Sequence, residues 1–186
     1  MTEQSKILVE KSPIEIRPAR PEDALPLAIV HVDSWRSAYR GFVPASTLDG
    51  LDYQQRVVRF RESLASHAEE TYVVEEDGEI VGFLTAGPCR DEDLDGEVTG
   101  EIWGIYLAPQ HWRRGIGTAL CRHGEQLLRS RGYRQAVLWV FADNAQARRF
   151  YEAVGFTADG ASKMLHPGAP REAVRYRKGL ENTVSL

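Results

Sequence analysis

The sequence predicts an α/β (α+β) fold in which one mixed sheet has helices on both of its faces. Three observations support this: short runs that alternate apolar and polar residues, two amphipathic stretches before a hairpin signal, and later apolar runs that alternate with helical patterns. A chain of 186 residues fits one domain. We expect that domain at residues 13–180, between a flexible tail at 1–12 and a short tail at 181–186.

The first half of the chain predicts one strand, two helices and a hairpin. Residues 14–17 alternate apolar and charged side chains before a proline, as a half-buried strand does. A proline followed by two acids is typical of a helix start and leads into residues 25–39. Residues 53–64 place their apolar side chains on one face of a second helix. Strands at 71–75 and 80–85 flank an Asp-Gly turn, which predicts a hairpin.

The second half adds a helix, a strand, a helix and closing strands. Over the whole chain the order is strand, two helices, three strands, helix, strand, helix and strands, which predicts a mixed sheet that is not doubly wound. Apolar residues recur at helical spacing after Ile116, and glycines follow both predicted helices as stop signals. The expected elements are an acidic loop at 89–100, a strand at 101–107, a helix at 116–131, a strand at 136–140, a helix at 144–155, and closing strands at 156–160 and 173–177 around a Pro/Gly loop.

Composition excludes several classes of protein. The net charge of -4 argues against general nucleic-acid binding. Cys89 and Cys121 are too few for a disulfide framework, and no apolar run approaches the roughly 18 residues that span a bilayer. The polar first residues do not resemble a secretory signal, so the expected location is cytoplasmic. The histidines have no metal-ligand spacing with the cysteines, and we predict no metal.

Residues 113–117, Arg-Arg-Gly-Ile-Gly, leave a strand and open a helix. Such a turn offers unpaired backbone N–H groups to an anion, and its glycines let a phosphate approach. Two adjacent arginines suit a diphosphate better than a single carboxylate. A dinucleotide fingerprint would need a third glycine where Leu120 stands, and a P-loop would need Gly-Lys-Ser/Thr. Alone, the turn could simply cap a helix at the surface.

The elements that follow this turn favour an acyl-coenzyme A site that binds a pyrophosphate. Asn144 and Tyr151 are seven residues apart, about two helical turns, so both side chains can point into one cleft. The alternative is that Asn144 only caps its helix and that Tyr151 is a non-catalytic residue at the rim.

These residues resemble the GNAT superfamily of N-acetyltransferases. The family's phosphate turn has the form Gln/Arg-x-x-Gly-x-Gly/Ala, and residues 112–117 match it except that Trp112 holds the first position. The family's next helix ends in Phe-Tyr-Glu-x-x-Gly-Phe, which residues 150–156 match. The resemblance covers residues 14–177 in element order, and its motifs lie in 101–156. It implies a central, splayed mixed sheet.

The resemblance also implies direct transfer of an acetyl group from acetyl-CoA, the co-substrate, to a primary amine in a ternary complex. The matching tyrosine, Tyr151, would protonate the departing thiolate. Glu101 would accept the amine proton through water, although it could equally be a solvated charge. The expected coenzyme A contacts are Ile105, Tyr106, Leu107, Trp112, Arg113, Arg114, Gly115, Ile116, Gly117, Thr118, Ala119, Asn144 and Tyr151.

The acceptor would lie near the first helix by analogy with the family. Trp35, Tyr39 and Trp103 are its expected contacts, although such aromatics are more often core residues. Asp33 is a further contact and the second candidate for the base, and it could equally be an exposed helix acid. The expected partner is a small-molecule or peptide amine, with no nucleic acid and no membrane.

Several features of the partners stay open. The acidity of the chain weakly favours a cationic acceptor such as a polyamine, an aminoglycoside or a basic peptide. A homodimer that pairs C-terminal strands would fit the family. A different reading is a non-catalytic acyl-CoA-binding sensor or regulatory module, which would bind acetyl-CoA without turnover.

Overall fold

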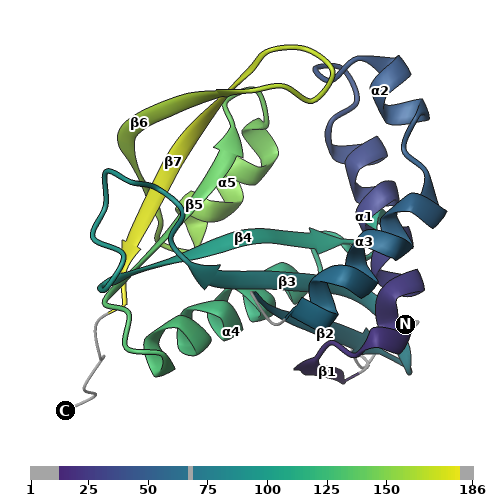
Figure 1. Cartoon of the computed structure of the whole chain (residues 1–186), viewed down its shortest axis with the longest axis horizontal. Coiled ribbons are helices and arrows are strands. Elements are labelled where there is room, and N and C mark those ends of the chain that lie inside the picture. The colour runs from purple at the N-terminus through teal and green to yellow at the C-terminus, as the bar shows by residue number, and fades with distance from the viewer. Residues whose placement is uncertain (1–12, 67–68, 181–186) are drawn as a thin grey trace, which may run out of the picture.

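The computed structural model describes residues 13–66 and 69–180, so the two expected tails lie outside the described residues. Within these residues the strands form a seven-stranded sheet in the order β1-β2-β3-β4-β5-β7-β6 (Figure 1), which confirms the predicted fold class. The strands are β1 (Ile14–Pro18), β2 (Glu70–Glu76), β3 (Glu79–Pro88), β4 (Thr99–Leu107), β5 (Gln135–Phe141), β6 (Thr157–Leu165) and β7 (Arg171–Gly179). The helices are α1 (Ala24–Ala38), α2 (Ala45–Asp49), α3 (Tyr53–Ser66), α4 (Ile116–Ser130) and α5 (Ala145–Ala153), with short 3-10 turns at Pro21–Asp23 and Pro109–His111.

The first four strands form an antiparallel block, and the predicted hairpin is the pair β2–β3. Asp77 and Gly78 have φ angles of 53° and 80° in its turn, which is the geometry that an Asp-Gly pair favours between two strands. The helix α2 was not predicted from the sequence. It has only five residues, too few to show a helical period.

The helices bury their apolar faces on opposite sides of this sheet. On one side, Leu27 of α1 packs in a buried cluster with Val73 and Phe83 of the sheet. On the other side, Leu120 of α4 and Tyr151 of α5 belong to the largest buried cluster. None of the helices in the described part of the chain is long and apolar enough to cross a bilayer.

The sheet opens between β4 and β5. These strands are parallel and pair only where residues 99–101 meet residues 135–137. Beyond this point β5, β7 and β6 rise away from β4 (Figure 1), which confirms the splayed sheet. The apex of the opening lies at Glu101 and Val137, the last pair of the parallel ladder.

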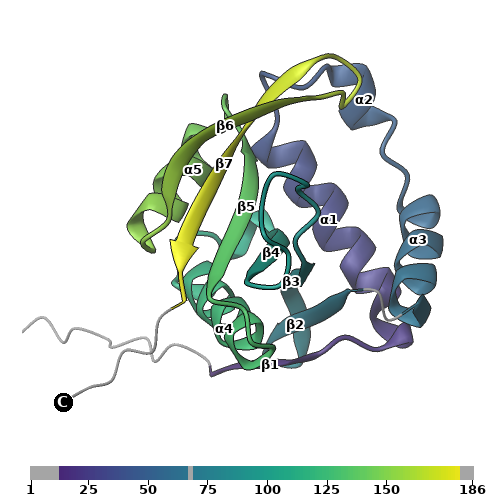
Figure 2. The same cartoon turned by 60° about the vertical axis from the view of Figure 1, so that its left-hand side comes forward.

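The β6–β7 hairpin is longer than predicted and arches over to α2 (Figure 2). The sequence predicted only 156–160 and 173–177 as strands. Most of β6 is exposed and polar, so its sequence lacks the apolar alternation that would have shown its full length. At the tip of the arch, a Cβ atom at Gly168 would overlap Thr47 of α2, so the two segments are in close contact.

Candidate active site

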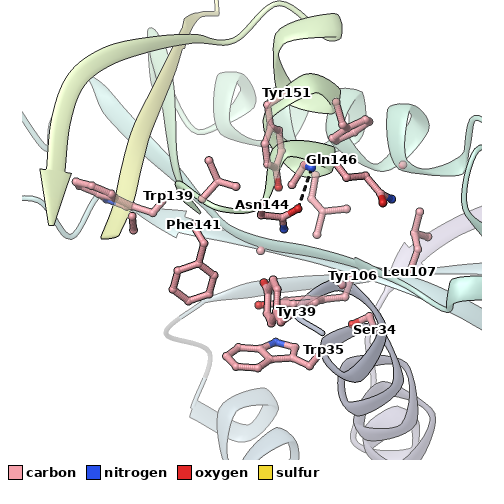
Figure 3. A pocket seen from close by; sticks show the side chains of 18 of the residues that line it. Ser34, Trp35, Tyr39, Tyr106, Leu107, Trp139, Phe141, Asn144, Gln146 and Tyr151 are labelled. Atoms are coloured by element: carbon pink, nitrogen blue, oxygen red, sulfur yellow. Dashed lines mark hydrogen bonds between the residues drawn. The ribbon is translucent and has the colours of Figure 1, made fainter. Parts of the chain in front are cut away.

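A cleft of about 1000 Å³ opens where β4 and β5 part, and we refer to it below as the cleft. Its walls come from α1, the second half of β4, the turn before α4, β5, α5 and the tip of the β6–β7 hairpin. Figure 3 shows side chains of α1 on one side of this cleft and side chains of α5 on the other. The open sheet therefore brings segments from both ends of the chain to one site.

The second half of β4 presents a backbone edge to the cleft. On the β5 side its paired residues end at Glu101, so the backbone of residues 102–107 has no strand partner there. Three residues that we expected to contact the coenzyme, Ile105, Tyr106 and Leu107, line the cleft. An extended molecule that carries amide groups could pair with such an edge as another strand would.

The turn between β4 and α4 is shaped to hold an anion. Arg113 and Gly115 have positive φ angles of 60° and 88°, and Gly115 caps α4 without a side-chain acceptor. Among the described residues, the amides of Gly117 and Thr118 have no hydrogen-bond acceptor. The Ala119 amide donates to the Gly115 carbonyl at 3.1 Å, so the helix already uses this expected contact. Unpaired amides at a helix N-terminus, beside residues of positive φ, form a concave donor surface for phosphate.

The two arginines of this turn lie in different surroundings. Arg113 lines the cleft, whereas Arg114 is not among the lining residues. Arg114 donates to the Glu76 carboxylate at 2.9 and 2.7 Å, and His111 Nδ1 lies 2.8 Å from the same carboxylate. The structure therefore brings one of the two expected arginines to the cleft. Arg149 of α5, which the sequence analysis missed, also lines it.

Trp112 and Ile116 flank the glycine turn, and only Trp112 is in contact with the cleft. Trp112 lines the cleft, and its Nε1 donates to the Leu107 carbonyl at 2.8 Å, which ties the turn to the end of β4. Ile116 is buried in the core beneath the turn, so it can offer an anion only its amide.

Asn144 and Tyr151 both line the cleft from α5. Asn144 also caps this helix, because its Oδ1 accepts a hydrogen bond from the Ala147 amide at 3.1 Å. The Tyr151 ring points into the cleft with its hydroxyl toward the centre (Figure 3). Burial raises the pKa of Tyr151 above the usual tyrosine range, with smaller contributions from Cys121 and Tyr106. The phenol therefore keeps its proton at neutral pH and can act as a donor.

The structure does not bring Glu101 into the cleft. Its side chain is 1% exposed and is not among the lining residues. Its carboxylate accepts hydrogen bonds from the Arg90 backbone amide and from Arg90 Nε, both at 3.1 Å, and forms an ion pair with Arg90 Nη2. The guanidinium of Arg90 then lies over the Trp103 ring, 4.1 Å from its centre, at the wall of the cleft. This geometry argues for a structural role, and the base role of Glu101 stays a prediction.

On the α1 side, Trp35, Tyr39 and Trp103 line the cleft, whereas Asp33 does not. The Asp33 carboxylate faces α3 and accepts a hydrogen bond from the Tyr53 hydroxyl at 2.7 Å. Trp35 Nε1 is buried and faces Tyr106, and its N–H partly offsets the rise that burial causes in the pKa of Tyr106.

Further residues line the cleft that the sequence analysis did not assign to it. A strand pattern could have placed Trp139 on one face of β5, but no local pattern shows that the β6–β7 tip returns to α1. The principal additions are Ser34, Ala38, Arg90, Trp139, Phe141, Gln146, Arg149, Phe150, Lys163, Leu165, His166 and Pro167. The ionised side chains of the described lining are cationic, and no carboxylate of the described residues belongs to it.

Other chemistries find no support at this site. Within the described residues, no group of three His, Cys, Asp or Glu side chains could hold a metal ion. Burial and the nearby Glu125 raise the pKa of Cys121 to about 12, so this buried thiol is a poor nucleophile.

Two solved structures illustrate the likeness of the fold. The PaiA N-acetyltransferase of Thermoplasma acidophilum in complex with coenzyme A superposes with a TM-score of 0.70 at 20% identity, over 90% of this chain and 99% of that one. YncA of Salmonella typhimurium with its cofactor acetyl-CoA gives a TM-score of 0.66 at 22% identity, over 92% and 96% of the two chains. At such identities the likeness concerns the fold alone.

Sequence relatives and a family model extend the likeness from the fold to the protein family. YuaI of Bacillus subtilis, named an uncharacterized N-acetyltransferase, is 33% identical over 142 residues, which cover 75% of this chain and 78% of YuaI. The mycothiol acetyltransferase of Amycolatopsis mediterranei is 30% identical over 142 residues, or 75% of this chain and 44% of that protein. The model of the acetyltransferase (GNAT) family matches residues 33–156. The chain therefore belongs to the GNAT family of acetyltransferases.

Proposed function

We propose that this protein is an N-acetyltransferase that moves the acetyl group of acetyl-CoA to a primary amine by direct attack in a ternary complex. The observation that carries this proposal is the meeting, in one cleft, of an unpaired strand edge, an anion-binding turn and a protonated tyrosine. The GNAT family and the coenzyme A complexes of its structural neighbours support the same co-substrate.

The coenzyme would be held mainly by backbone groups. The free amides of Gly117 and Thr118 and the side chains of Arg113 and Arg149 would bind the pyrophosphate. The edge of residues 105–107 would pair with the amides of the pantetheine arm, chiefly through residues before Leu107, whose carbonyl already accepts from Trp112 Nε1. Positioning two reactants in this way converts a bimolecular step into an effectively unimolecular one, so we expect it to supply most of the rate acceleration.

The proposed reaction forms one bond and breaks another. The amine nitrogen forms a bond to the thioester carbon, and the bond from that carbon to sulfur breaks. Tyr151 gives its proton to the sulfur, and the proton lost by the amine nitrogen restores the phenol or passes to solvent. The raised pKa of Tyr151 keeps the donor proton in place until the thiolate forms.

A thiol-release assay tests this proposal. The assay would offer acetyl-CoA with small amines, amino acids, polyamines, aminoglycosides and peptides, while calorimetry measures acetyl-CoA affinity in parallel. We expect binding of acetyl-CoA and turnover with at least one amine class. Absence of acetyl-CoA binding would refute the proposed acetyl-CoA site. Binding without turnover across the panel would favour the alternative hypothesis of a non-catalytic acyl-CoA-binding sensor. The cytoplasmic location and the homodimer stay predictions.

A further inference from the structure

A second cavity of about 220 Å³ lies beside the cleft, between α1, α3 and β4. Three residues of β4, Trp103, Gly104 and Tyr106, line both spaces. A Cβ atom on Gly104 would lie 2.5 Å from the Tyr106 ring, so this ring packs directly over the glycine backbone. The two spaces therefore share one wall, which Trp103, Gly104 and Tyr106 form.

The second cavity carries two arginines that have no ion pair with any described residue. Arg56 and Arg59 of α3 both line it. Burial and the nearby charge of Arg59 lower the pKa of Arg56 below its usual value, as expected for a half-buried cation that faces another cation. Arg56 is partly buried and Arg59 is exposed, and two guanidinium groups without an ion pair at one cavity can bind the same anionic group.

His31 adds a second, independent observation at the same place. It lines the second cavity, only 6% of its surface is exposed, and its Nδ1 has no hydrogen-bond partner in the described chain. Burial and, to a lesser extent, the charge of Arg56 lower the pKa of His31 to about 3. The ring is therefore neutral at pH 7. A buried polar ring without a partner is the sort of group that a bound ligand satisfies.

One carboxylate among the described residues, that of Glu69, also lines the second cavity. Glu69 accepts a hydrogen bond from the Ser63 hydroxyl. The carboxylate of Glu69 also raises the pKa of Arg90, a smaller contribution than that of Glu101. No ion pair within the described residues joins Glu69 to Arg56 or Arg59, so both guanidinium groups are free to bind an added anion.

We propose that the second cavity receives a carboxylate of the acceptor, so that the acceptor is a primary amine that also carries a carboxylate group. This proposal rests on the N-acetyltransferase function above. The rings of Phe60, Phe83 and Tyr106 line the same space and suit an apolar body between the two polar ends. The cationic lining of the cleft also disfavours a polyamine, which replaces the weak preference for a cationic acceptor that the net charge had indicated.

The test compares acids with their amides on the coenzyme A-loaded protein. Calorimetry would measure the binding of phenylalanine and of amino acids with an amine at the end of two- to six-carbon chains, each against its amide. The variants are Arg56→Gln, Arg59→Gln and Arg56→Lys. Arg61→Gln is the matched control, because Arg61 is an exposed arginine of α3 that does not line the second cavity. Thermal melts would show that each variant is folded.

We expect at least one acid to bind about tenfold more tightly than its amide, which corresponds to about 1.4 kcal/mol. This preference should vanish in Arg56→Gln, weaken in Arg59→Gln, persist in part in Arg56→Lys and be unchanged in the control. Equal binding of acids and amides, binding of neither across the series, or the same loss in Arg61→Gln would overturn the proposal. Turnover of simple amines without any preference for acids would overturn the carboxylate proposal and leave the proposed function intact. Failure to bind acetyl-CoA would refute the proposed function itself.

Discussion

The proposed coenzyme side of the cleft is built largely from backbone groups, whereas the acceptor side is built from side chains. The unpaired edge at residues 105–107 and the amides of Gly117 and Thr118 follow from where a strand ends and a helix begins. The aromatic rings and cations of the other side come from α1, α3, β4 and the β6–β7 tip. Backbone donors constrain sequence only through glycines and spacing, so one side can stay constant while the other changes its ligand.

The largest expected effect concerns the tyrosine where the two sides meet. Tyr151→Phe should lower turnover by about 100-fold or more, because a positioned general acid contributes on the order of 10²–10⁴. Acetyl-CoA affinity should be unchanged, since the phenol acts on the leaving thiolate. Steady-state thiol release and calorimetry measure the two quantities, and Tyr133→Phe, a tyrosine outside the cleft lining, is the control. Full turnover in Tyr151→Phe would contradict the acid assignment.

The adjacent arginines of the turn provide a matched pair. Arg113→Gln should weaken acetyl-CoA binding by about tenfold, as expected when one charge-assisted hydrogen bond is lost. Arg114→Gln should leave the affinity nearly unchanged and lower the free energy of unfolding by about 2 kcal/mol, because Glu76 is buried and loses a partner. Calorimetry and urea denaturation separate these outcomes. Equal loss of affinity in both variants would mean that Arg114 leaves Glu76 to bind phosphate.

His31 predicts a pH dependence of stability on the acceptor side. Its pKa is about 3 in the folded chain against an ordinary 6.5, so the unfolded chain takes up the proton first as pH falls. Its contribution to the free energy of unfolding should therefore decrease between about pH 6.5 and 3, by up to about 1.4 kcal/mol per pH unit. Urea denaturation of the wild type and of His31→Gln would measure this. Identical slopes against pH in both proteins would refute the assignment.

The smallest expected effect on the chemistry is at Glu101, at the apex between the two sides. Glu101→Gln should lower stability by about 1–3 kcal/mol, because the buried Glu101 side chain loses its charge-assisted hydrogen bonds to the half-exposed Arg90. The pH profile of kcat/KM should keep its shape. Loss of the acidic limb of that profile would instead show that Glu101 is the base, and would correct the structural role that its burial favours.

The sequence could predict the parts of the site that local rules determine. The strand, the glycine turn and the helix over residues 101–131 follow one another closely, so spacing alone brings the free amides together. Local rules could not show that Glu76, far away in the sequence, engages Arg114. They also gave no sign of the second cavity, because Arg56 and His31 meet only when α1 and α3 pack together.

The contact between Gly168 and Thr47 has a consequence for the size of the acceptor. His166 and Pro167, next to Gly168 at the hairpin tip, line the cleft, and the tip meets Thr47 of α2 at this end of it. An amine attached to a bulky carrier would have to pass this contact to reach the thioester. We therefore expect free metabolites to be better acceptors than lysines on the surface of folded proteins, which a thiol-release assay with both kinds of amine would measure.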